Sequence, residues 1–125
     1  IKGVITQPDK KGKRGNQRIE SPVSLMAKSL NLQTFKPHNL AKEEIQNDFD
    51  ITNADVLVVV AYGNLIPTWI LESNIKAINI HYSLLPSYRG ASPIQSSLLN
   101  NDKKTGVTFM QMSEGFGCRE SYKMF

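Results

Sequence analysis

Seven consecutive residues, Asp55 to Ala61, constrain the fold of this chain more than any other stretch. They read DVLVVVA, and after the leading aspartate every side chain is apolar, most of them β-branched. Such a run is expected of a central parallel strand that is covered on both faces. We therefore predict a parallel sheet whose faces are covered by helices.

Weaker patterns place other elements on either side of this strand. The predicted strands are residues 1–6, 33–35, 77–80 and 107–112. The predicted helices begin at residue 22, cover 41–49 and 67–71, and begin again at residue 93. Because strands alternate with helices, we predict an α/β fold with an open, mostly parallel sheet.

The first and last helices carry recognisable starts. Ser21 is a favourable N-cap, and Pro22 suits the first helical position. After Ser92, Gln95 stands where a capping box needs Glu or Gln. Apolar residues recur at helical spacing in the first helix, and this stripe is predicted to be core: Val23, Met26, Ala27 and Leu30.

Size and composition indicate one soluble domain. The 125 residues suffice for a single hydrophobic core, and 40% of them are hydrophobic and 21% charged. No apolar run approaches the roughly 20 residues that cross a bilayer, so we expect no membrane association. The single cysteine, Cys118, cannot form an internal disulfide, and this suits a reducing cytoplasm.

Basic residues gather near the start of the chain. The net charge is +4, and residues 1–20 hold two acidic side chains, Asp9 and Glu20, against six basic ones: Lys2, Lys10, Lys11, Lys13, Arg14 and Arg18. Most of them fall in a Gly- and Lys-rich segment, Gln7 to Glu20, that we predict to be a long mobile loop. A local basic excess favours an anionic partner, and the alternative is a merely solvated loop.

Two predicted strands end in polar residues, and ligands of open α/β sheets bind at such ends. One strand leads into Tyr62-Gly63-Asn64 and the other into His81-Tyr82-Ser83. Strand alternation puts Asn79 and His81 on one face. An amide N–H and an imidazolium N–H can both donate to a carbonyl oxygen that gains negative charge, as in acyl transfer. The alternative is that both side chains satisfy loop backbone.

The stretch from Ile78 to Gln95, INIHYSLLPSYRGASPIQ, resembles the signature of folate-dependent formyltransferases. Its core is Ser83-Leu84-Leu85-Pro86, followed by Arg89-Gly90 and Pro93-Ile94. Further stretches resemble the branch that acts on methionyl-tRNA: Thr6 to Asp9, Arg14-Gly15, Ser21 to Val23, Val58 to Gly63, and Gly106 to Met112. The resemblance covers residues 1 to about 115 in order.

This resemblance implies a Rossmann-like formyltransferase topology and a reaction. The donor would be 10-formyltetrahydrofolate, and the acceptor would be the amino group of methionine on initiator tRNA. Asn79 and protonated His81 would be the catalytic residues that hold the oxyanion. The residues implied for folate binding are Tyr62, Gly63, Ser83, Leu84, Leu85 and Pro86, and those implied for tRNA binding are Lys10, Lys11, Lys13 and Arg14. We expect a cytoplasmic monomer that needs no metal.

The resemblance also marks where the chain departs from the family. Members carry an aspartate that orients the histidine, just after a Met-x-Glu-Gly-like stretch, and here Gly117 takes its place. We expect residues 1–115 to be a partial catalytic domain and residues 116–125 to be an unmatched tail. The family's first strand and helix would precede Ile1, so the chain looks like a fragment. Strands on either side of that missing strand would then expose apolar faces.

Two other functions remain open on the sequence. One is formylation of a small amine, such as a sugar nucleotide or a purine precursor, because those enzymes share the SLLP segment. The other is a folate- or RNA-binding module without catalysis. No glycine-rich phosphate-binding run follows a predicted strand, and His38 and His81 are too far apart in sequence for a zinc-like ligand spacing.

Overall fold

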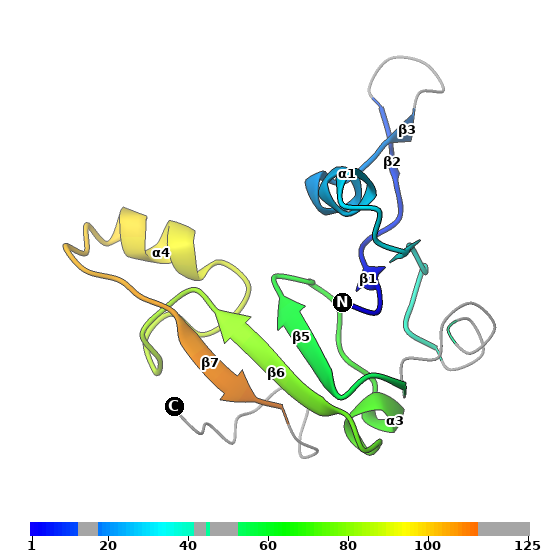
Figure 1. Cartoon of the computed structure of the whole chain (residues 1–125). Helices are drawn as coiled ribbons and strands as arrows, with labels where there is room; N and C mark the ends of the chain where they lie inside the picture. The colour runs from blue at the N-terminus through cyan, green and yellow to red at the C-terminus, as the bar shows by residue number, and fades with distance from the viewer. Residues whose placement is uncertain (13–17, 42–44, 46–52, 113–125) are drawn as a thin grey trace. The chain divides into compact units, whose positions relative to one another are not determined.

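The computed structural model describes residues 1–12, 18–41, 45 and 53–112 (Figure 1). The chain forms two compact units, residues 1–54 and 55–125, and each is described by itself. None of the described helices is both long enough and apolar enough to cross a membrane.

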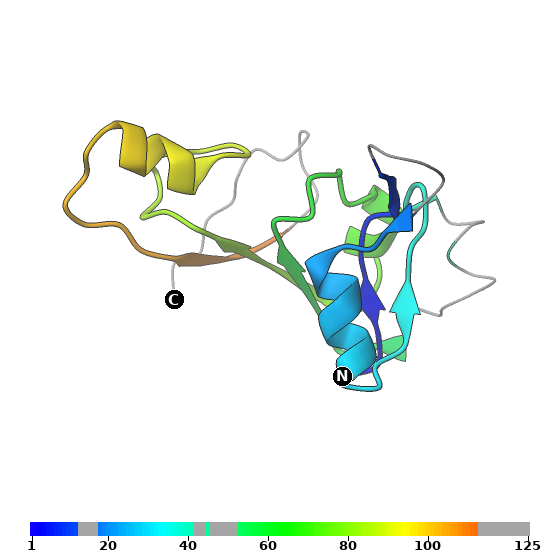
Figure 2. The same cartoon turned by 90° about the horizontal axis from the view of Figure 1, so that it is seen from above.

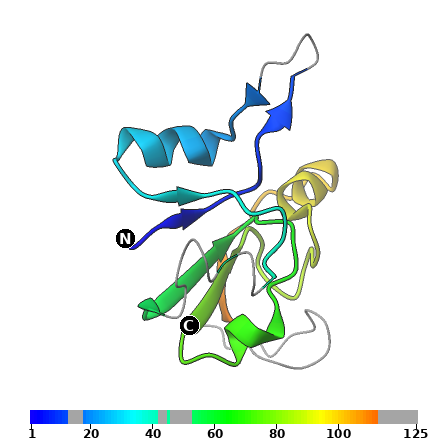
Figure 3. The same cartoon turned by 90° about the vertical axis from the view of Figure 1, so that its right-hand side faces the viewer.

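The first unit is built on a parallel strand pair. β1 (Val4–Ile5) pairs with β4 (Thr34–Phe35), with Val4 opposite Thr34 and Ile5 opposite Phe35. Helix α1 (Pro22–Ser29) runs alongside the two strands (Figures 2 and 3). Strands within 1–6 and 33–35 and a helix from residue 22 were all predicted, and the structure confirms them.

The start of α1 forms as its sequence predicts, but its apolar stripe does not become core. The Ser21 hydroxyl accepts a hydrogen bond from the Ser24 amide at 3.1 Å. Of the predicted core stripe only Ala27 is buried, at 3% exposure, and the exposed members are Val23 at 51%, Met26 at 61% and Leu30 at 59%. The prediction was wrong for these three residues, because β1 and β4 leave this face of the helix open.

The segment predicted to be a mobile loop contains a β-hairpin. β2 (Lys10–Lys11) pairs antiparallel with β3 (Arg18–Ile19), and Figure 3 shows this hairpin extending away from β1 and β4. The prediction of a loop was therefore wrong for these four residues. The predicted helix at 41–49 falls largely outside the described residues, although Ile45 is buried.

The second unit holds a three-stranded sheet in the order β5, β6, β7. β5 (Val56–Val60) and β6 (Lys76–His81) are parallel, and β7 (Thr108–Gln111) is antiparallel to β6. Two short helices complete the unit, α3 (Thr68–Leu71) and α4 (Pro93–Leu99) (Figure 1). The α/β fold and the parallel pairing of β5 with β6 agree with the sequence, whereas the antiparallel direction of β7 was not predicted.

Two local predictions fail in this unit. Among the described residues β5 pairs only with β6, so it is an edge strand instead of a covered central one, and one of its faces is exposed: Val56, Val58 and Val60. The capping box at α4 is absent, because Ser92 makes no side-chain cap hydrogen bond. Its backbone, at φ −131° and ψ 49°, lies outside the extended conformation typical of an N-cap.

Candidate active site

The pair Asn79 and His81 lies on β6, the middle strand of the sheet in the second unit (Figure 1). Their cross-strand partners on β7 are Met110 and Thr108. Both side chains are half-buried, and alternation along the strand gives them the same face. Because β6 is paired on both sides, the spacing between the two groups is set by the strand and not by a loop.

The loop that follows β6 folds back over the partner of His81. The Thr108 hydroxyl donates to the carbonyl oxygen of Ser83 at 2.7 Å and accepts from the Leu85 amide at 3.2 Å. The Ser83 side chain is fully buried and donates to the Ser87 carbonyl at 2.7 Å. These bonds hold the Ser83–Pro86 segment against the end of the sheet that carries His81.

One nitrogen of the His81 ring makes a hydrogen bond within the protein. Its Nε2 lies 2.9 Å from the carbonyl oxygen of Tyr88. A carbonyl can only accept, so Nε2 carries the proton of this bond and Nδ1 remains for a second partner. The backbone of Tyr88 has φ +55°, a left-handed conformation that is uncommon outside glycine and that turns its carbonyl towards the ring.

The Tyr88 side chain is tied on the far side of this turn. Its hydroxyl donates to Asp102 at 2.5 Å and accepts from Asn100 at 2.8 Å. The hydrogen bond to the Asp102 carboxylate is the main reason that the pKa of Tyr88 is raised. The turn that contacts His81 is thus anchored at both its backbone and its side chain.

Tyr62 and Gly63 follow β5, the strand next to β6. Because β5 and β6 are parallel, their carboxyl ends lie at the same edge of the sheet, so these residues and the Ser83–Pro86 segment leave that edge together. Tyr62 is half-buried, and burial raises its pKa. A side chain at Gly106 would meet Leu84, because a Cβ there would lie 2.5 Å from Leu84 Cδ2. Leu84 therefore packs against Gly106, just before β7, while 55% of Leu84 remains exposed.

Some of the basic residues of the first unit lie on the β2–β3 hairpin. Lys10 and Lys11 on β2 and Arg18 on β3 are all exposed, so the hairpin presents cations to solvent. Lys13 and Arg14, the other two residues predicted to bind tRNA, lie outside the described residues. So does Gly117, where the family aspartate was expected.

Charged groups converge at the base of this hairpin. Lys36 Nζ lies 2.6 Å from Asp9 Oδ1 and 3.1 Å from Glu20 Oε2, and Lys28 Nζ lies 2.6 Å from Glu20 Oε1. The contact with Asp9 contributes most to a raised pKa at Lys36. Hydrogen bonds from Lys28, then Ser24 and Lys36, lower the pKa of Glu20 from 4.5 to about 2.

We predict that acid weakens the base of the hairpin only below about pH 4.5. A carboxyl whose folded-state pKa is lowered stabilises the fold fully above its unfolded-state pKa, and this contribution is lost as the pH falls through the folded-state value. For Glu20 that window runs from 4.5 down to about 2. NMR titration of the Glu20 carboxyl should give a midpoint near the lower end. A midpoint near 4.5 would contradict the contacts with Lys28, Ser24 and Lys36.

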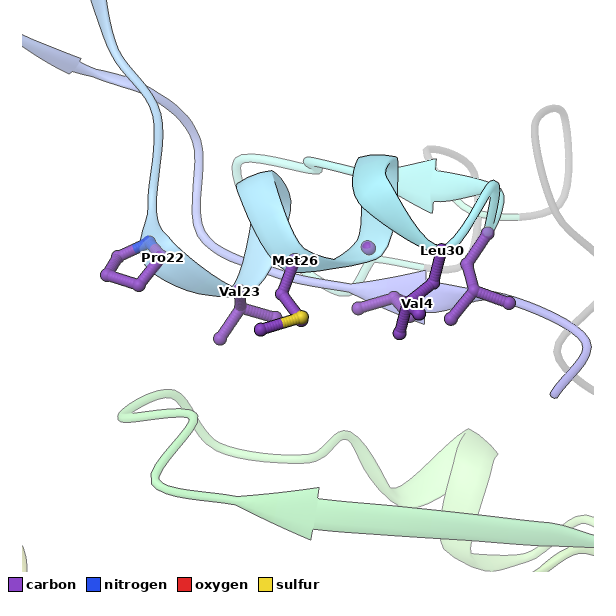
Figure 4. A pocket seen from close by; sticks show the side chains of 7 residues that line it. Val4, Pro22, Val23, Met26 and Leu30 are labelled. Carbon is purple, nitrogen blue, oxygen red and sulfur yellow. The ribbon is translucent and has the colours of Figure 1, made fainter.

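An apolar hollow lies on the exposed side of α1, with a volume of about 290 Å³ (Figure 4). Its lining is carbon and sulfur almost throughout: Val4, Pro22, Val23, Met26, Ala27, Leu30 and Leu32. It offers no acid, base or hydrogen-bond donor for catalysis. Within the described ranges, no three His, Cys, Asp or Glu residues are grouped as metal ligands would be.

Sequence reasoning identified the strand residues of the site but missed its supports. Thr108 and Lys36 drew no attention, because each acts through partners distant in the chain. The Tyr88 carbonyl was missed because the sequence does not show the backbone conformation that turns it towards His81. Only the placement of Thr108 within the matching stretch Gly106 to Met112 gave a signal that could have found it.

The sequence of this chain is similar to those of known proteins. The sequence model of a family described as formyl transferase matches residues 1–117. The methionyl-tRNA formyltransferase of Buchnera aphidicola subsp. Schizaphis graminum is 47% identical over 112 residues, which are 89% of this chain and 36% of that protein. This chain thus spans little more than a third of the length of that relative.

Solved structures agree on the fold. Glycinamide ribonucleotide transformylase 1 from Geobacillus kaustophilus superposes with a TM-score of 0.62 at 24% identity, over 93% of this chain and 77% of that one. A sugar N-formyltransferase from Shewanella sp. FDAARGOS_354 gives 0.54 at 27% identity, over 77% and 36%. The predicted Rossmann-like α/β fold of formyltransferases is confirmed.

Proposed function

Because the chain belongs to the formyl transferase family, we propose that the protein transfers a formyl group from 10-formyltetrahydrofolate to methionyl-initiator tRNA. The observation that carries this proposal is the placement of Asn79 and His81 on one face of β6, beside the anchored Ser83–Pro86 segment. The 47% identity to a methionyl-tRNA formyltransferase supports the choice of acceptor.

In the proposed reaction, the amino nitrogen of methionine forms a bond to the formyl carbon, and the bond from that carbon to N10 of the folate breaks. The amine gives up one proton and N10 gains one. Negative charge collects on the formyl oxygen meanwhile, and the amide N–H of Asn79 and the Nδ1–H of protonated His81 would donate to it. Removing one donor of this kind typically costs about 10²-fold to 10³-fold in rate.

The Tyr88 carbonyl would orient His81 in this mechanism. By accepting a hydrogen bond from Nε2, at 2.9 Å between nitrogen and oxygen, it would restrain the ring and leave Nδ1 to face away from the turn. This is an orienting contact that comes from the loop itself. An orienting carboxylate also stabilises the charged imidazole, and a neutral carbonyl does so less strongly.

The edge at the ends of β5 and β6 has the chemical character that a folate needs. Leu84, Leu85 and Pro86 supply apolar atoms, and Tyr62-Gly63 leaves the neighbouring strand, so a flat ring system could lie among groups with few polar atoms. Ser83 is fully buried and bonded within its own loop. We therefore propose that Ser83 shapes the pocket and that its neighbours touch the folate.

The exposed cations of the hairpin would meet the acceptor stem of the tRNA. The exposure of Lys10 and Lys11 on β2 supports this proposal, and Lys13 and Arg14 would complete the contact. Contacts of this kind release counterions, so binding should weaken steeply as salt rises. We also propose that the protein works in the cytoplasm as a monomer.

Formyl transfer itself tests the proposal. With labelled 10-formyltetrahydrofolate in single-turnover assays, we expect transfer to methionyl-initiator tRNA that slows as salt rises, and much slower transfer to aminosugar nucleotides or to glycinamide ribonucleotide. Transfer to a small amine alone would contradict the proposed acceptor, and the similarity to a sugar N-formyltransferase makes this the main alternative. Folate binding without any transfer would contradict the catalytic role.

A further inference from the structure

The two legs of the basic hairpin are joined at their base by one lysine. Asp9 immediately precedes β2, and Glu20 immediately follows β3. Lys36, which immediately follows β4, contacts both carboxylates, at 2.6 Å and 3.1 Å. A single cation therefore links both ends of the hairpin to the β1–β4 pair.

Other polar groups complete this cluster and leave Glu20 well satisfied. Its two oxygens accept from Lys28 at 2.6 Å and from the buried Ser24 hydroxyl at 2.7 Å. Beside it, the hydroxyls of Thr6 and Ser21 are hydrogen-bonded at 2.9 Å. Thr6 ends the segment that contains β1, so the hairpin base is also fastened to the first strand.

We propose that Lys36, Asp9 and Glu20 are positioning residues, which fix the direction of the basic hairpin so that its cations engage the phosphates of the acceptor RNA together. This inference rests on the proposed function. An isolated two-stranded hairpin is marginally stable in water, and this one has only two residues in each strand. Holding its base in place lowers the entropy that binding would otherwise cost.

The direction in which one substitution changes RNA affinity distinguishes a positioning role from a purely electrostatic one. Removing a carboxylate beside a basic surface should strengthen RNA binding if only the electrostatic field matters, because the protein becomes more positive. If Asp9 positions the hairpin, Asp9→Ala should instead weaken binding of initiator tRNA, by about twofold to fivefold for the loss of one partly exposed ion pair. Glu72→Ala, at an exposed acid of the second unit, is the matched control and should not weaken binding.

Lys36 gives the second measurement. Lys36→Met should weaken tRNA binding more than Lys2→Met, which removes the same charge from an exposed residue without a described contact. Lys36→Arg should restore most of the affinity, because arginine can contact both carboxylates. Tighter binding by Asp9→Ala, or equal losses for Lys36→Met and Lys2→Met, would overturn the proposal.

Hydrogen exchange of the free chain tests the positioning without RNA. In Lys36→Met, amides of β2 and β3 should exchange several-fold faster than in the original chain, while amides of β6 keep their rates. Unchanged amide exchange rates in β2 and β3 would contradict the positioning role even if the variant still binds tRNA. Faster exchange in a chain that fails to bind tRNA would instead uphold the positioning and contradict the proposed acceptor.

Discussion

Replacement of His81 with alanine should lower the single-turnover rate of formyl transfer by about 10²-fold to 10⁴-fold. The substitution removes one of the two donors proposed for the oxyanion and leaves Asn79 to act alone. It also breaks the 2.9 Å bond to Tyr88, so part of the loss would come from a freer loop. The variant should still bind folate, because the Ser83–Pro86 segment is held mainly by Thr108.

His38→Ala is the matched control for this experiment. His38 is exposed, and it belongs to the first unit, whereas the proposed catalytic pair belongs to the second. We expect its transfer rate to stay within about twofold of the original, as for most exposed substitutions. If His81→Ala transferred the formyl group as fast as His38→Ala, the assignment of His81 would be wrong.

Thr108→Val should destabilise the chain by about 2–4 kcal/mol, and urea unfolding followed by circular dichroism would measure the loss. Valine has nearly the same shape, but it can make neither of the two hydrogen bonds of the threonine hydroxyl. The carbonyl of the buried Ser83 and the amide of Leu85 would then lack their partners. Each polar group stranded in this way costs about 1–3 kcal/mol.

Two companion variants decide whether the hydroxyl is responsible. Thr108→Ser keeps the hydroxyl and loses only a methyl group, so it should cost about 1 kcal/mol. Thr105→Val makes the same exchange at an exposed residue and should change stability by less than about 0.5 kcal/mol. Equal stability of Thr108→Val and Thr105→Val would show that the loop does not depend on these bonds.

The sequence correctly predicted those features that depend on residues close together in the chain. Ser21 and Pro22 start a helix, and the alternation of Asn79, Ile80 and His81 gives the two polar groups one face. The supports of the site depend on pairing between distant segments. Thr108 reaches the loop after β6 only because β7 returns antiparallel beside it, and a single sequence carries no local sign of that direction.

Burial was harder to predict than secondary structure. The apolar pattern of α1 and of β5 shows which side chains share a face, but not whether another element covers that face. Val58 and Met26 are accordingly more than half exposed, although both were expected in the core. The hairpin was missed for a similar reason, because its base is joined by Lys36, which follows β4 and lies sixteen residues beyond Glu20.

The position of the Asn79–His81 pair within a strand limits how this region can change in evolution. Substitutions along β6 leave the two side chains on their face as long as the strand keeps its length, and the loop after it can vary around its anchor points. Gain or loss of a single residue between Asn79 and His81 would turn one of them to the opposite face, where Ile78 and Ile80 lie. Homologous genes should therefore tolerate changes of residue in this segment far more readily than changes of length.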